Sequence, residues 1–533
     1  MAIMAMDTAR QSNVCVFCLS LLCSKLAFAG DWQFDPSLKV DETYTDNVAL
    51  TRGNEQSSIV SQTGILFDSS YNSQHVDFNL ASESTYAFYS HDHELDNDYH
   101  TLASDIRFQL WPNGLSIIAG VNVANQSQNS SRNALADIVS ADTVQVETYN
   151  GGVEYIVNNS DFIVNSTASY QEVTAEDDIG NRNELSASIG MQNGRAARTT
   201  FWNIQHNYQK LKNNENDGEI VETEAVIGYI SDFKINPFIR YYNEDNTGNV
   251  NNGNRSLESN SYGAGLRWLV SSRLYIDASY NKPTGNKLDL DGNAQKEYIN
   301  AQINWEPSAR TKLEASYSER FYGDSYGFNL QHRNRRLSNT IDYTESVQTL
   351  TRNNYIPVVL GFFWCPADNV VNAISDCIVQ DGTTIAPEGY QLNTFSNFEL
   401  AEDAFFSLNK NLSWNSTLTL PRTTFTLIAR KENRENLDTR IEDDNSYISF
   451  SIKRRVSGRS NVNLQMSYTD TNLQIDTEQE RQDKYRRYQV GYEKSLNSTL
   501  SFNIDFSYVN RSSNDFTLNY KEGRVSAKIT KGF

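Results

Sequence analysis

Apolar and polar residues alternate along most of this chain. Within 75–89, Val76, Phe78, Leu80, Tyr86 and Phe88 share one parity. Such a two-residue period predicts β-strands with one apolar and one polar face. Each segment is long enough to cross a hydrocarbon layer, which needs about 9–11 tilted residues. The pattern returns at 102–110, 115–123, 185–191, 262–268, 299–305, 462–468 and 500–508.

The connections between these segments alternate in length. Short ones lie at 72–74, 112–114, 158–160, 193–195, 271–272, 457–459 and 496–498, and long ones near 45–56, 90–97, 126–141, 243–257, 282–294, 347–400, 432–443 and 470–482. Short periplasmic turns and long external loops are typical of membrane barrels. We therefore predict an all-β, transmembrane, antiparallel up-and-down β-barrel of about 24 strands, within a range of 22–26. The turn near Phe405 to Leu420 cannot be fixed from the pattern.

Aromatic residues gather at both ends of the predicted strands, as interfacial girdles would require. The positions before long loops are Tyr86, Phe88, Tyr170, Tyr208, Tyr280, Tyr317, Tyr468 and Tyr508, and those before short turns are Trp111, Tyr155, Tyr229, Trp268 and Trp305.

The two chain ends fit this prediction. The apolar stretch Val14 to Phe28, followed by a small-residue cleavage site, predicts a signal peptide over 1–29. The remaining 30–533 would form a single barrel that begins near Trp32, so we expect no amino-terminal plug. The last strand ends on Phe533, which we expect to be recognised by the barrel-assembly machinery. This strand should pair with the first strand, Phe34 to Tyr44, to remove the sheet edge.

One predicted external insert, about 347–400, differs from its surroundings. Its segment 355–364 is apolar without alternation, so it should pack against something. The lumen mouth is one possibility, and the outer rim or a partner is the other. Cys365 and Cys377 follow, twelve residues apart in an exported chain. They suggest a disulfide, with two reduced thiols as the alternative.

The composition and the absence of known motifs argue against several classes of function. The 533 residues carry a formal net charge of −20, which argues against nucleic acid as a partner. No catalytic motif is present, so we expect neither an enzyme nor a cofactor. His91, His93 and His100 lie in an acidic loop and are a weak candidate for a metal site, with a solvated loop as the alternative. For the other acidic loops, binding of cations that bridge lipopolysaccharide is one interpretation, and simple hydration is the alternative.

Basic residues form a second candidate set, at predicted turns and on one nearby strand. A ring of arginines in a lumen would select anions, whereas a solvated turn or a salt-bridge network is the simpler interpretation. The set is Arg333, Arg335, Arg336, Arg454, Arg455, Arg486 and Arg487.

Two stretches resemble a known family. Residues 32–38 with 42–48, and the middle stretch 326–345, are similar to the PEP-CTERM system-associated outer membrane proteins. The resemblance implies a Gram-negative outer-membrane β-barrel encoded with exosortase and exopolysaccharide loci, and it supplies no catalytic residues.

Together these observations predict a porin-like channel or export component. Its partners would be lipopolysaccharide, exopolysaccharide or export proteins. The alternative is a non-conducting structural or adhesive protein that binds extracellular matrix through its long loops.

Overall fold

The computed structural model describes residues 30–533 apart from 54, 112–113, 128–137, 141–142, 177–180, 214–215, 250–256, 286, 351–353, 367–377, 380–389, 402–404, 476, 478–479 and 515–517. For 126–127, 350, 354–366, 378–379 and 390–401 it describes the backbone alone. The predicted signal peptide and Cys377 lie outside the described residues, and no side-chain position is described for Cys365.

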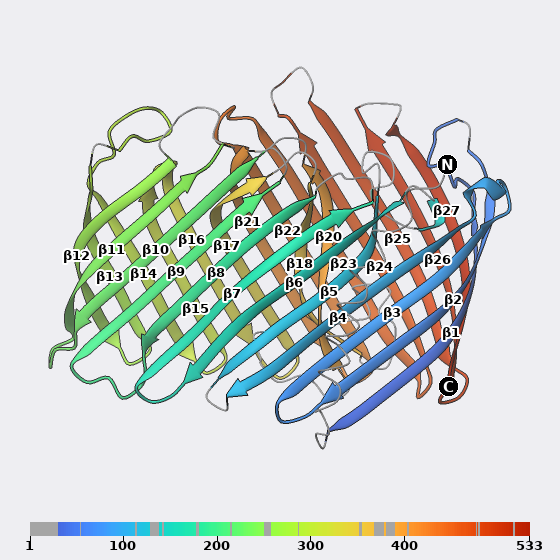
Figure 1. Ribbon diagram of the computed structural model, residues 1–533, viewed down its shortest axis with the longest axis horizontal. Helices are drawn as coiled ribbons and strands as arrows, with labels where there is room; N and C mark the ends of the chain where they lie inside the picture. Colours follow the sequence, from blue (N-terminus) through green and yellow to red (C-terminus); the bar gives the residue numbers. More distant parts are fainter. Residues whose placement is uncertain are drawn as a thin grey trace, which may run out of the picture.

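The wall of the molecule is a single 24-stranded antiparallel sheet (Figure 1). Its strands are β1 (Asp31–Thr45), β2 (Ser58–Asn72), β3 (Val76–Tyr89), β4 (Asn97–Trp111), β5 (Leu115–Ser127), β6 (Thr143–Asn158), β7 (Phe162–Ala175), β8 (Arg182–Asn193), β9 (Thr200–Lys212), β10 (Asp217–Tyr229), β11 (Ile235–Thr247), β12 (Leu257–Ser271), β13 (Leu274–Pro283), β14 (Tyr298–Ser308), β15 (Thr311–Arg320), β16 (Gly323–Arg333), β17 (Leu337–Leu350), β21 (Phe405–Thr419), β22 (Thr423–Asn436), β23 (Glu442–Ser457), β24 (Ser460–Leu473), β25 (Arg481–Ser495), β26 (Leu500–Ser513) and β27 (Tyr520–Gly532). The region near 405–420 is therefore one strand, and its turn follows at 420–422.

The sheet closes on itself through its first and last strands. Ser37–Thr45 of β1 pairs with Gly532–Arg524 of β27, while the other edge of β1 pairs with β2. The Phe533 N–H donates to the Pro36 carbonyl at 3.0 Å. This confirms the predicted closure and the predicted barrel, because each strand in the ring has a partner on both sides.

Alternation along the strands sorts side chains between the two faces of the wall. On β11, Ile239 and Tyr241 are 63% and 48% exposed, whereas their neighbours Arg240 and Tyr242 are 4% and 1% exposed. The exposed apolar side chains face outward, as lipid contact requires. All five aromatic residues predicted for the turn end are exposed, and so are Tyr86, Phe88, Tyr170, Tyr280 and Tyr508 at the other end.

We call the end of the barrel that carries the turn 73–75 the turn end, and the opposite end the loop end. The predicted alternation of connection lengths fails in places at the loop end. Phe321 and Tyr322 alone join β15 to β16, and only 437–441 join β22 to β23, where a long loop was expected.

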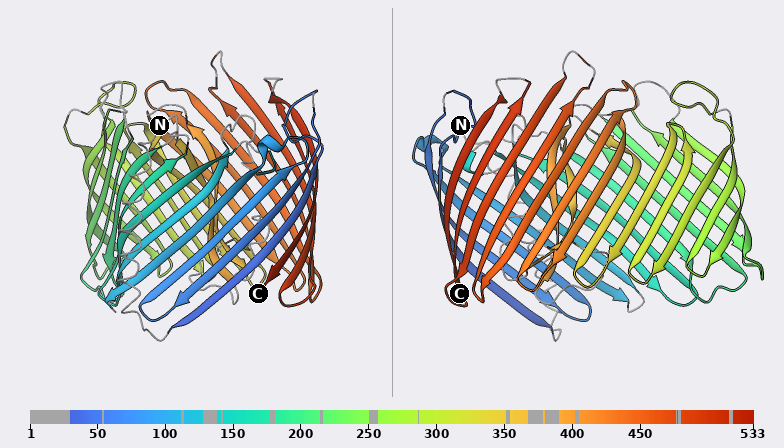
Figure 2. Two further views of the ribbon diagram at one scale, coloured as in Figure 1. Left: turned by 45° about the vertical axis from the view of Figure 1, so that its right-hand side comes forward. Right: turned by 180° about the vertical axis from the view of Figure 1, so that it is seen from behind.

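The chain between β17 and β21 contains a small separate sheet. Its strands are β18 (Asn354–Pro366), β19 (Ile378–Val379) and β20 (Tyr390–Ala401), in the order β19-β18-β20. In the front view and in the view turned by 45°, the described strands fall within the outline of the barrel (Figures 1 and 2). β19 lies close to β21 of the wall.

The barrel is not round, since the view turned by 45° is narrower than the view from behind (Figure 2). Cα atoms of β10 and β17 come within 8 Å of each other, although six strands separate them along the wall. We call the part bounded by β10–β17 the narrow lobe and the rest the wide lobe. No helix in the described part of the chain is long and apolar enough to cross a membrane, a finding that does not bear on strands.

Candidate functional site

The tip of the β15–β16 hairpin bends out of the wall into the narrow lobe. The β14–β15 ladder reaches only Ala301 and Tyr317, and the β16–β17 ladder begins at Phe328 and Tyr343. Residues 318–327, which we call the inner hairpin, therefore pair only within the β15–β16 hairpin and with no neighbouring strand. The Phe321 N–H donates to Ser259 Oγ on β12 at 2.7 Å, and the Phe321 carbonyl accepts from the Leu290 N–H at 2.9 Å.

Arg320 fastens the inner hairpin to the opposite side of the lobe. Its Nη1 lies 2.9 Å from Glu222 Oε1 on β10 and 3.2 Å from Glu244 Oε2 on β11. Arg320 also donates to the Tyr242 hydroxyl, and this hydroxyl donates to Glu244 at 2.9 Å. Glu244 is only 3% exposed, and the ion pair with Arg320 compensates its buried charge.

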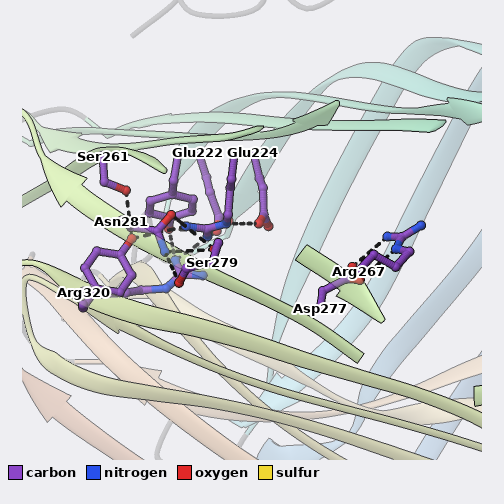
Figure 3. A network of polar contacts seen from close by, with 11 residues as sticks. Glu222, Glu224, Ser261, Arg267, Asp277, Ser279, Asn281 and Arg320 are labelled. Carbon is purple, nitrogen blue, oxygen red and sulfur yellow. Dashed lines mark hydrogen bonds and ion pairs between the residues drawn. The ribbon is translucent and has the colours of Figure 1, made fainter. Parts of the chain in front are cut away.

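A second polar layer lies next to this one (Figure 3). Arg240 Nε donates to Glu224 at 2.7 Å, and Arg240 Nη1 lies 3.3 Å from the Tyr298 hydroxyl and 3.4 Å from Asn281 Oδ1. Ser261 Oγ completes the layer at 2.8 Å from the same tyrosine hydroxyl. Strands β10, β11, β12, β13 and β14 are therefore tied together across the lobe.

A third layer closes the lobe nearer the turn end. Arg267 makes two parallel hydrogen bonds to Asp277, at 2.8 and 2.7 Å. Its guanidinium lies 4.0 Å from the Phe201 ring centre and 4.5 Å from that of Tyr275, a cation–π arrangement. Gly265 leaves room for the neighbouring Phe238 ring, because a Cβ there would come within 2.4 Å of it.

An apolar cluster covers the loop end of the narrow lobe. Phe321, at 0% exposure, packs with residues from β12, β17, β21 and the connection after β22. Tyr322 packs against the cluster, and burial raises the pKa of its hydroxyl above the ordinary value while Arg320 opposes the shift. The cluster consists of Leu257, Phe321, Val347, Phe406, Leu408 and Leu437. Together with the three polar layers, it places packed side chains across the narrow lobe.

The wide lobe differs, because several lumen-facing polar residues in the middle of β4–β9 are exposed, although a buried apolar cluster of Val144, Val146, Val173 and Ala175 lies at the loop end of β6 and β7. On β9, Asn203, Gln205 and Asn207 point away from the outward-facing Trp202 and Ile204, and all three are exposed. Thr167 on β7 and Ser188 on β8 are exposed in the same way. We call the lumen side of β4–β9 the open wall.

The mouth of the wide lobe is partly covered above β1–β4. The short helix η2 (Ile138–Ser140) places Val139 in a buried cluster with Val60, Tyr89 and Tyr99. Arg524 of β27 donates to Ser140 Oγ at 3.1 Å, so this connection spans the closing seam.

The predicted basic residues do not form one ring. Arg333, Arg335 and Arg336 lie at the turn end between β16 and β17, and Arg454 and Arg455 lie at the turn end of β23. Arg454 shares its parity with outward-facing Phe450, and Arg455 has the lumen parity. On β25, Arg486 shares the outward parity of Tyr488, whereas Arg487 has the lumen parity. These arginines therefore form separate groups and not an anion-selective ring.

The three histidines of the candidate metal site contact different neighbours. His91 Nδ1 lies 2.8 Å from Ser58 Oγ, His93 Nδ1 lies 3.2 Å from Asp96, and His100 Nε2 lies 2.9 Å from Asp98. Within the described residues, no group of three or more His, Cys, Asp or Glu side chains is arranged to hold a metal ion.

Sequence reasoning missed the residues that fill the narrow lobe. Arg240, Glu244 and Arg320 each occupy a lumen-parity position on a strand whose other parity is apolar. That parity was a usable signal for an inward charge. Which strands would meet across the lumen was not encoded in any local pattern.

The closed ladder, the alternating burial and the outward apolar surface define a transmembrane antiparallel β-barrel of the outer-membrane kind. No protein-family model and no curated protein sequence matches the chain. Among solved structures, it is similar to the siderophore receptor PirA from Pseudomonas aeruginosa, with a TM-score of 0.40 and 9% identity over 94% of this chain and 80% of that one.

Two further solved structures are similar at the same low level. The alcaligin outer membrane receptor FauA from Bordetella pertussis has a TM-score of 0.36 and 10% identity over 94% of this chain and 76% of that one. A loop L8 deletion mutant of OmpT, an outer membrane protein of Vibrio cholerae, has a TM-score of 0.32 and 8% identity over 95% of this chain and 100% of that one. Because these scores are below 0.5, the fold assignment rests on the ladders and burial of this chain.

Proposed function

We propose that the protein is a channel or export component in the outer membrane of a Gram-negative cell. The observation that carries this proposal is the open wall, where polar side chains such as Asn203 and Gln205 are exposed inside a closed barrel. A wide barrel with a water-filled polar interior is suited to passing solutes. The turn end would face the periplasm and the loop end the exterior.

The family resemblance supports an association with surface polysaccharide. On this proposal the client is exopolysaccharide, and the export proteins of the same system are the partners. Lipopolysaccharide would surround the loop end, and the barrel-assembly machinery would insert the chain.

Conductance in planar lipid bilayers tests the proposal directly. Leu350 and Phe405 are paired, so a short turn of about four residues can replace 351–404 without breaking the ladder. We expect KCl conductance from the full-length barrel, and a larger conductance from this shortened variant. Replacement of 250–256 by two residues is a matched control, because Asn246 and Leu257 are likewise paired at the narrow lobe. Absence of conductance from both the full-length and the 351–404 variant would reject the channel.

One observation favours the alternative, a non-conducting structural or matrix-binding protein. The polar layers and the apolar cluster of the narrow lobe reduce the free lumen. A deletion strain separates the two functions. Loss of polysaccharide export supports the channel, whereas normal export with poor matrix retention supports the structural role.

A further inference from the structure

On β7, on β9 and on the turn-end half of β8, the open wall carries hydrogen-bonding groups without charge. Charged residues of the open wall lie beside this area: Arg107 pairs with Glu154 between β4 and β6, and Arg182 and Glu184 lie at the loop end of β8. On β9, the lumen-facing positions from Phe201 to Leu211 contain no ionisable residue, and neither do those of β7 from Ile163 to Ala175. Amides and hydroxyls occupy most of these positions. The exposed ones on β7–β9 include Asn165, Thr167, Ser188, Asn203, Gln205 and Asn207.

The opposite part of the wide lobe is built differently. Its lumen face carries ion pairs, such as Arg434 with Glu432 at 3.0 Å and Arg511 with Asp483 at 2.9 Å. Charge is therefore abundant on the lumen side of β21–β27 and absent from that of β7 and β9. The uncharged area formed by β7, β9 and the turn-end half of β8 is therefore a local property, in a chain whose net charge is −20.

Amides of this kind suit a particular solute chemistry. An asparagine or glutamine side chain offers two donors and an acceptor, and a solute hydroxyl can use both. Among the described residues, the side chains of Asn203 and Gln205 have no hydrogen-bond partner, so their groups are available. A charged solute would find no opposite charge on β7 or β9 to offset its loss of water, and the neighbouring Arg107 is already paired with Glu154 at 2.7 Å.

The route past this wall is also the one that the fold leaves open. The inner hairpin and the layers around Arg240 and Arg267 occupy part of the narrow lobe, which favours the wide lobe as the route of a solute. We propose that the solute of this barrel is an uncharged, hydroxyl-rich molecule that hydrogen-bonds to the amides of β7–β9 as it passes. This inference rests on the proposed channel and names its substrate class.

Current block by oligosaccharides in planar bilayers tests the substrate class. The probes are an uncharged linear glucan hexamer and a carboxylated galacturonate hexamer of the same length. We expect the uncharged hexamer to block at a concentration at least tenfold lower than the carboxylated one. Gln205→Ala should weaken the uncharged block about fivefold, the effect of one net hydrogen bond.

A matched pair of charge variants locates the effect on the open wall. Gln205→Glu should weaken block by the carboxylated hexamer further, whereas Gln465→Glu should leave both blocks unchanged. Gln465 has the lumen parity on β24 of the opposite wall, so the chemical change is identical and only its place differs. Equal block by both hexamers, or equal effects of the two glutamate variants, would overturn the substrate class while leaving the channel intact.

Failure of the channel itself has a different signature. If neither the full-length nor the 351–404 variant conducts, the proposed function fails. Saturation-transfer NMR on the detergent-solubilised full-length protein then tests whether the amides of β7–β9 bind the solute, independently of conduction. Transfer to the uncharged hexamer that Gln205→Ala abolishes supports the amide site, and absence of transfer overturns it.

Discussion

Replacing Arg320 by alanine tests whether the inner hairpin is held by its ion pairs. Arg320 faces Glu244, whose side chain is 4% exposed, and Glu222, whose side chain is 35% exposed. Removing one partner of a buried pair leaves an uncompensated charge and costs about 3–5 kcal/mol. The more exposed Glu222 adds at most about 1 kcal/mol. We therefore expect Arg320→Ala to lower the free energy of unfolding by about 3–5 kcal/mol at pH 7.

Urea unfolding of the barrel in phospholipid vesicles, followed by tryptophan fluorescence, measures this loss. Lys312→Ala is the matched control, because Lys312 lies on the same face of β15 and pairs with Glu314 at 2.8 Å. That pair is 41% and 36% exposed, so its loss should cost less than about 1 kcal/mol. The double variant Arg320→Ala with Glu244→Gln should recover part of the loss, because the buried charge is then gone. Equal effects of Arg320→Ala and Lys312→Ala would refute the reasoning.

Three further outcomes follow from local geometry. Because burial raises the pKa of Tyr322, the folded state holds the hydroxyl proton more tightly than the unfolded state does. The stability that the protonated hydroxyl contributes is therefore intact below pH ~10 and is lost as the pH rises above it. The free energy of unfolding should fall less between pH 8 and pH 11 for Tyr322→Phe than for wild type. Gly265→Val should cost about 1–3 kcal/mol in the same assay, since its Cβ would meet the Phe238 ring at 2.4 Å, whereas Gly151→Val, with nothing within 4 Å, should be near neutral. Deletion of Phe533, whose side chain is 70% exposed, should lower the amount of assembled barrel in cells severalfold but hardly change the free energy of unfolding in vitro. Heat-modifiable mobility in gels measures the amount of assembled barrel. Unchanged assembly would contradict the predicted recognition of Phe533 by the barrel-assembly machinery.

The wall of the barrel was predictable because its causes are local. Lipid on one side and polar groups on the other impose a two-residue period, and Ile239, Arg240 and Tyr241 show it within three positions. Pairing of the terminal strand with Phe34–Tyr44 followed from the need to remove the sheet edges. The strand count followed from the number of such segments.

The filling of the narrow lobe was not predictable in the same way. Arg320 and Glu222 are 98 residues apart, and Arg320 and Glu244 are 76 apart, so no spacing rule connects them. The basic residues that the sequence singled out cluster along the chain, yet Arg336 and Arg455 end at turns of different strand pairs. The basic residues that lie close together in the sequence are therefore mostly at the turn end of the barrel. The charged residues that meet inside the lumen are single residues on separate strands.

The short connection at Phe321–Tyr322 is the sequence feature that best explains the lobed shape. A long polar loop at that tip would carry unpaired backbone groups and could not enter a packed interior without burying them. A two-residue connection keeps Arg320 and Gly323 paired, so the inner hairpin enters the lobe with its own ladder satisfied. Its neighbours β14 and β17 end their ladders with it at Tyr317 and Phe328, which frees the tip to bend inward. The exception to the alternation of loop lengths thus marks the place where the barrel wall fills its own lumen.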